Sequence, residues 1–140
     1  MTYDDELLNF SSGLIDSEIL EDTDEYIEFL STNFTFIGSK ISLKNEKEFF
    51  DYTFKKRNFS SIHQFFELNN KVRNKIISSE HIYYIGDNLT EIGIVFNGND
   101  FFKVLNFLIN NIPEHHYFFS IRDKWCLFVA TEGYIEYGKK

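Results

Sequence analysis

The chain is 140 residues long, which fits one domain that buries roughly 70% of its unfolded surface. Hydrophobic residues make up 43% and charged residues 26%, a composition that argues against wholesale disorder. No apolar run approaches the roughly 18 residues of a membrane span, and the first residues are acidic where a secretory signal is basic. The single cysteine, Cys126, cannot form an internal disulfide. We therefore expect a soluble, cytoplasmic protein with a single domain over residues 1–140.

The net charge of −8 is concentrated near the N-terminus. Residues 1–39 contain ten acidic residues and no Lys, Arg or His, whereas residues 40–75 contain nine basic residues against four acidic ones. A negative pole of this kind attracts basic proteins and repels nucleic acid, whose binding depends on Lys and Arg. The composition therefore predicts a basic protein partner, with no direct nucleic acid contact and no membrane contact.

The first predicted element is a helix from about Asp16 to Leu30, because apolar residues recur there at three- and four-residue intervals. Asp16 is its predicted cap. Acidic residues with no lysine four positions away cover the outer side, although like charges at that spacing cost a few tenths of a kcal/mol per pair. One interpretation is a solvated helix face; the other is a binding surface. The predicted partner-binding residues are Asp16, Glu18, Glu21, Asp22, Asp24, Glu25 and Glu28.

The next segment predicts one strand and two helices. Residues 34–37 alternate as a short strand does and are followed by a Gly-Ser turn. Asn45 and Glu48 have the spacing of a capping box and predict a helix to about Arg57. Serines at 60 and 61 can cap a further helix that extends to about Ile76.

From His81 onward the pattern changes to strands around one helix. The helix, at about 99–112, is apolar on all but a narrow strip and ends at Pro113. Both faces of 125–130 are apolar, which is typical of a central strand covered on both sides. The fold class predicted is α+β: an antiparallel sheet of about five or more strands, with N-terminal helices and one central crossover helix. The predicted strands are 81–86, 91–96, 116–121, 125–130 and 134–137.

A search for chemistry finds no catalytic motif. The glycines never form a phosphate-binding pattern, and His115 and His116 would point to opposite faces of a strand, so neither cofactor nor metal is predicted. A Cys126–His116 nucleophile pair across adjacent strands is conceivable. The alternative is a buried, inert thiol between two large apolar residues. We therefore expect no enzyme and no catalytic residues.

Aromatic residues make up 19% of the chain, and most have core spacing. Tyr117, Tyr134 and Tyr137 have a second interpretation as interface anchors, because tyrosine combines contact area with a polar tip.

The second half of the chain, residues 82–138, contains a series of aromatic strand and turn motifs. They are Tyr83-Tyr84-Ile85-Gly86-Asp87, Glu91-Ile92-Gly93-Ile94-Val95-Phe96, His115-His116-Tyr117-Phe118-Phe119, Asp123-Lys124-Trp125-Cys126-Leu127-Phe128 and Glu132-Gly133-Tyr134-Ile135. With these motifs the segment resembles immunity proteins of bacterial polymorphic toxin and contact-dependent growth inhibition systems. The resemblance implies a protein without catalysis that binds the toxin domain of a cognate effector, often a basic nuclease, and blocks its active site or substrate groove.

Three functional hypotheses follow from these patterns. The leading one is a toxin-neutralising immunity protein, which accounts for both the acidic N-terminal segment and the C-terminal resemblance. The second is an acidic nucleic acid mimic that inhibits a defence nuclease, and the same carboxylates motivate it. The third is a small hydrolase or transferase that uses Cys126 or His116. The sequence leaves open the toxin's identity and activity, the oligomeric state and the strand order.

Overall fold

The structure is a computed structural model that describes residues 1–54 and 59–140. The described helices are α1 (Tyr3–Ser11), α2 (Asp24–Asn33), α3 (Phe59–Leu68), α4 (Asn70–Ile77) and α5 (Phe101–Asn111), with a 3₁₀ turn, η1 (Gly98–Asp100), before α5. The described strands are β1 (Glu18–Leu20), β2 (Thr35–Ile37), β3 (Lys40–Ser42), β4 (Glu48–Thr53), β5 (Ile82–Gly86), β6 (Gly93–Phe96), β7 (His116–Ser120), β8 (Trp125–Ala130) and β9 (Tyr134–Lys139). The fold is α+β.

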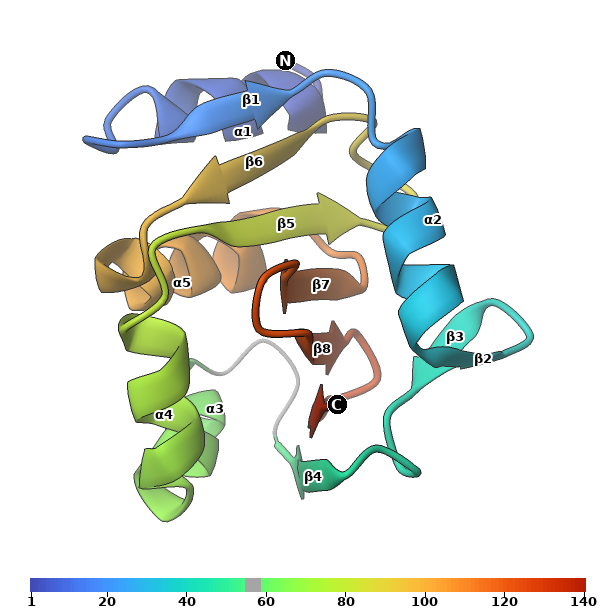
Figure 1. The fold of residues 1–140 in the computed structure, drawn as a ribbon. Coiled ribbons are helices and arrows are strands. Elements are labelled where there is room, and N and C mark those ends of the chain that lie inside the picture. Colours follow the sequence, from blue (N-terminus) through green and yellow to red (C-terminus); the bar gives the residue numbers. More distant parts are fainter. Residues whose placement is uncertain (55–58) are drawn as a thin grey trace.

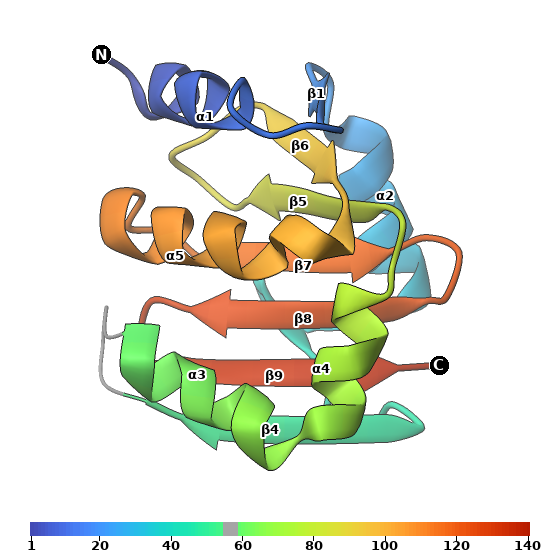
Figure 2. The same ribbon diagram turned by 90° about the vertical axis from the view of Figure 1, so that its left-hand side faces the viewer.

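Seven of the strands form one antiparallel sheet in the order β1-β6-β5-β7-β8-β9-β4. The hairpin β5–β6 and the meander β7–β8–β9 join neighbours in the chain, and α5 crosses over β5 to connect β6 with β7 (Figure 2). The predicted α+β class, antiparallel sheet and crossover helix are confirmed. The two outermost strands, β1 and β4, both come from the N-terminal half of the chain.

Both faces of the sheet are covered. Helices α1, α3, α4 and α5 lie on one side, and α2 with the small β2–β3 hairpin lies on the other (Figures 1 and 2). Strand β8 is buried along its whole length and divides its side chains between two cores. Trp125, Leu127 and Val129 enter the core under the four helices, while Cys126, Phe128 and Ala130 enter the core under α2. The prediction of a central strand apolar on both faces is confirmed.

The predicted helix from Asp16 to Leu30 is wrong at its N-terminal half. Residues 18–20 form the edge strand β1, paired with β6, and the helix begins only at Asp24. Ile19 packs toward the core under the four helices, whereas Leu30 belongs to the core under α2. The apparent apolar stripe therefore joins residues from opposite faces of the sheet. Asp16 caps nothing, and helix α1, with its capping box at Thr2, was not predicted.

The predicted helix from Asn45 to Arg57 is also wrong. Residues 48–53 form the edge strand β4, which pairs with β9 along its full length. Phe49 packs toward the core under α2 and Phe50 toward the opposite core, as neighbours on a strand must. Pairing with β9 overrides the local helix signal. Residues 55–57 of this prediction lie outside the described part of the chain.

The remaining helix and strand predictions hold with two changes. Ser60 and Ser61 do not cap the third predicted helix, because α3 already begins at Phe59 and both serines lie inside it. The helix predicted to run to Ile76 is divided into α3 and α4, because Asn69 between them has non-helical φ and ψ of −125° and 65°. The strand at 34–37 is confirmed as β2, and all five strands predicted after His81 are present. Asp100 occupies the N-cap position of α5 without a capping bond; the capping side chain is that of Asn97, at the 3₁₀ turn.

Candidate functional site

All seven carboxylates predicted to bind a partner are exposed. They do not share one helix: Asp16 precedes β1, Glu18 lies on β1, and a turn leads to three residues on α2. The segment runs from the outer edge of the sheet onto the helix that crosses one of its faces (Figure 1). We call this surface the acidic face; it consists of Asp16, Glu18, Glu21, Asp22, Asp24, Glu25 and Glu28.

The acidic face lacks compensating cations among the described residues. Within that part of the chain, the ion pairs involve other carboxylates, for example Lys40 Nζ with Glu132 Oε2 at 2.7 Å and Lys75 Nζ with Asp123 Oδ2 at 3.6 Å. One carboxylate has a structural role, since Asp22 Oδ1 accepts the backbone N–H of Asp24 at the start of α2. The uncompensated charge creates a negative potential over this edge of the molecule.

Apolar and aromatic groups lie beside these carboxylates. Ile15 is 93% exposed and Ile27 is 50% exposed. The half-buried rings of Tyr26 and Tyr83 stack with their centroids 5.3 Å apart. A hollow of about 650 Å³ adjoins β1 and is lined by Ile15, Asp16, Ser17, Glu18, Glu80, His81, Tyr83, Val95 and Asn97. A binding surface with a desolvated centre needs such groups among its charges.

Sequence reasoning missed the residues that the second half of the chain contributes here. Glu80, Tyr83 and Asn97 reach this surface only because β1 pairs with β6, in the register Ile19 opposite Ile94. No local pattern signals that pairing, since the two segments are far apart in the sequence.

A second polar site is the buried carboxylate of Glu114. Its Oε1 accepts the backbone N–H groups of Asn88 and Leu89, both at 2.8 Å, and its Oε2 accepts the Thr90 hydroxyl at 2.7 Å. A Cβ added to Gly86 would collide with this carboxylate, so a larger residue at position 86 would displace Glu114 from these contacts. These contacts fix the turn between β5 and β6, which is a structural role.

His116 lies close by and is 2% exposed. Burial lowers its pKa to about 3, so the ring is neutral at pH 7. Its Nδ1 lies 2.7 Å from the hydroxyl of Tyr84, and burial raises the pKa of Tyr84 well above its usual value. Both groups are therefore neutral at pH 7, and the hydrogen bond engages Nδ1 with the Tyr84 hydroxyl and not with a nucleophile.

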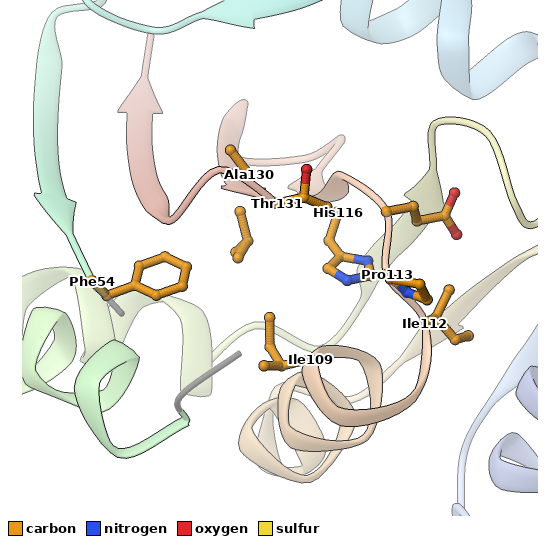
Figure 3. Close-up of a pocket in the computed structure, with 9 residues that line it drawn as sticks. Phe54, Ile109, Ile112, Pro113, His116, Ala130 and Thr131 are labelled. Atoms are coloured by element: carbon orange, nitrogen blue, oxygen red, sulfur yellow. The ribbon is translucent and has the colours of Figure 1, made fainter. Parts of the chain in front are cut away.

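His116 also borders a cavity of about 410 Å³ (Figure 3). Phe54 faces the imidazole across this space, with Ile109 of α5 and Ala130 of β8 on the walls (Figure 3). The lining is mainly apolar, and the Glu114 carboxylate binds the β5–β6 turn instead. Among the described residues that line the cavity, no nucleophile is paired with a base.

The conceivable Cys126–His116 pair is excluded by the register of the sheet. Cys126 lies opposite Phe119 and His116 opposite Val129, so their side chains enter different cores. Burial also raises the pKa of the Cys126 thiol, which makes it a poor nucleophile. The enzyme hypothesis loses its only proposed catalytic pair.

His115 points away from His116 and serves a different contact. Its Nδ1 accepts the backbone N–H of Thr131 at 3.0 Å, and its Nε2 lies 3.4 Å from Glu132 Oε1. Within residues 1–54 and 59–140, no group of three or more His, Cys, Asp or Glu side chains is arranged to hold a metal ion.

The proposed tyrosine anchors are largely core residues. Tyr117 and Tyr137 are buried, in the core under α2 and in the core under the four helices respectively. The anchor interpretation is therefore wrong for these two. Tyr134 is half-buried and packs on Phe128.

Comparisons with known proteins found no matching family model, no similar curated protein and no similar solved structure. In the described part of the chain, no helix has the length and apolar character needed to cross a bilayer. Function is therefore inferred from the chain's own surface and sequence.

Proposed function

We propose that this protein is a cytoplasmic immunity protein that binds and neutralises a cognate bacterial toxin domain. The observation that carries the proposal is the acidic face: seven exposed carboxylates that run from the β1 edge of the sheet onto α2, none of them in an ion pair among the described residues. The resemblance of residues 82–138 to immunity proteins supports the same assignment. The toxin class that fits this charge is a basic nuclease.

The mechanism of inhibition is competition for cationic side chains. A nuclease holds phosphates with Lys and Arg, and carboxylates placed against those groups exclude the nucleic acid. Complementary charge also accelerates association toward about 10⁸–10⁹ M⁻¹s⁻¹ at low salt. Tyr26, Tyr83 and Ile15 supply the apolar contact that keeps water from the centre of the interface.

The test is the association rate with the toxin domain encoded beside this gene, measured by stopped-flow or surface plasmon resonance at several salt concentrations. The double variant Glu21→Lys/Glu28→Lys should slow association roughly tenfold and flatten its salt dependence. A matched control, Asp51→Lys/Glu67→Lys, makes the same change in net charge at two exposed carboxylates that lie off the acidic face, and it should have a much smaller effect.

Equal effects of the two double variants would overturn the proposed surface, because net charge alone would then explain them. If the toxin domain does not bind at all but a defence nuclease does, the immunity assignment is wrong and the nucleic acid mimic takes its place.

A further inference from the structure

The edge of the sheet opposite β1 is an open strand. β4 is six residues long, pairs with β9 on one side only, and forms the outermost strand at the bottom of Figures 1 and 2. Directly after the strand, the N–H of Phe54 donates to the carbonyl of Gly133 at 2.8 Å. Because alternate residues of an antiparallel strand bond to the same neighbour, this bond shows which residues of β4 direct their backbone groups toward β9 and which direct them away from it. Phe49, Asp51 and Thr53 therefore direct their backbone N–H and C=O groups outward, where no described strand pairs with them.

Natural sheets protect such edges with short strands, proline, lysine, bulges or a covering element. β4 has no proline, glycine or lysine within its six residues, and three of them are aromatic. Phe49, Phe50 and Tyr52 are only half-buried. An exposed edge of this length and composition is a template for another strand.

The charges along this edge are self-complementary. Lys47 lies in the bend directly before β4, and Asp51 lies within the strand. Both are exposed, neither takes part in an ion pair among the described residues, and each lies two positions from Phe49. When two antiparallel copies of one strand pair about a central residue, positions equally far from the centre lie opposite each other. Pairing about Phe49 therefore places each Lys47 opposite Asp51 of the second copy.

Other registers are less favourable. Because the outward-bonding residues must pair with each other, the two-fold axis passes through a residue and not between two residues. An axis through Phe50, Tyr52 or Thr53 does not bring Lys47 opposite Asp51. A centre at Asp51 would oppose this carboxylate to its own copy, and like charges directly opposite destabilise a strand pair. The register about Phe49 instead forms two oppositely charged pairs.

The order of the sheet also favours this edge for self-association. The acidic face adjoins β1, which is the strand farthest from β4. Two copies joined at β4 hold their negative poles at opposite ends of one continuous sheet, so the repulsion between chains of net charge −8 is smallest in this arrangement.

We propose that β4 is a homodimerisation edge at which two copies of this chain pair antiparallel about Phe49, with Lys47 of each copy facing Asp51 of the other. This assignment is independent of the toxin. It leaves both acidic faces free, so that the dimer presents two binding surfaces. In this register Glu48, Phe49 and Phe50 of each strand pair with one another, and so short a ladder predicts a reversible dimer whose population rises with protein concentration.

The test is sedimentation equilibrium of the full chain over a wide concentration range. The mass should rise from 16.7 kDa toward twice that value. Lys47→Asp and Asp51→Lys each create two like-charge pairs and should weaken the dimer roughly tenfold or more. The double variant Lys47→Asp/Asp51→Lys restores opposite charges and should restore the dimer.

The control Glu21→Lys, at the opposite edge, should leave the dimer intact, and matching circular dichroism spectra should show that every variant is folded. A mass of 16.7 kDa at all concentrations would overturn the proposal. So would a dimer that is indifferent to Asp51→Lys, or a double variant no stronger than the single ones. A monomer whose toxin binding falls with Asp51→Lys would assign the edge to the toxin instead.

Discussion

The two edges of the sheet differ in length, charge and aromatic content. β1 is three residues long and is flanked by the carboxylates of the acidic face, whereas β4 is six residues long and half aromatic. Because β1 is short and lies among like charges, it is a poor partner for another strand. The same carboxylates attract cationic groups to the surface around it. β4 is twice as long and half aromatic, and the exposed Lys47 precedes its two carboxylates. The comparison teaches that the two ends of one sheet can differ enough in length and composition to suit different contacts, which is the basis of the two proposals above.

The largest expected effect on stability comes from a substitution that destabilises only the β1 end of the sheet. Glu114→Ala removes the acceptor for two backbone N–H groups and the Thr90 hydroxyl in the β5–β6 turn. Leaving buried donors unsatisfied should lower the free energy of unfolding by about 3 kcal/mol. Hydrogen exchange should accelerate at β6 and β1 and stay slow at β4 and β9. Uniform acceleration across all four strands would contradict a local role for this carboxylate.

A somewhat smaller effect is expected from the protonation of His116, which lies on the middle strand of the sheet, β7. Burial lowers the pKa of His116 to about 3 in the folded protein, against 6.5 for a histidine exposed to water in the unfolded chain. Below pH 6.5 the unfolded state therefore binds the additional proton, so stability falls as the pH falls. The loss from this group is about 2 kcal/mol between pH 7 and pH 5.

The control for this pH dependence is His116→Gln, measured by urea unfolding at each pH. The variant keeps hydrogen-bonding groups near Tyr84 but lacks the titration. The stability difference between wild type and variant should therefore shrink as the pH falls from 7 to 5. A constant difference across that range would show that His116 does not titrate as described.

The smallest effect is expected at the β4 edge from an exposed ion pair. Lys71 Nζ lies 3.7 Å from Glu48 Oε1, and the lysine side chain is 81% exposed. Lys71→Ala should change the free energy of unfolding by less than about 0.5 kcal/mol, because exposed pairs are screened by water and salt. A loss above about 1 kcal/mol by chemical denaturation would mean that this pair, and not the β9 ladder, holds β4 in place.

The same two edges mark the limit of what the sequence could predict. The strands after His81 and the helix at 99–112 were recognised because their partners follow closely in the chain and their patterns are local. β1 and β4 were mistaken for helix because their partners are remote: Glu18 lies opposite Val95, and Glu48 lies opposite Lys139. Long-range pairing overrides local propensity without leaving a signal in the segment itself.

The candidate site, like the fold, was predictable only in the part that depends on local sequence. Exposure of the seven carboxylates followed from their number and from the absence of nearby basic residues. The hollow beside them did not, because Glu80 and Tyr83 come from the second half of the chain. Only the placement of β1 beside β6 brings these parts together.

Hydrogen exchange of the full chain, with and without the cognate toxin domain, tests the central claim most directly. The toxin should slow exchange over residues 15–28 and at β6, which lies beside β1, and leave β4 unchanged. Protection confined to other parts of the molecule, with residues 15–28 exchanging as fast as in the free protein, would contradict the assignment of the acidic face as the toxin-binding surface.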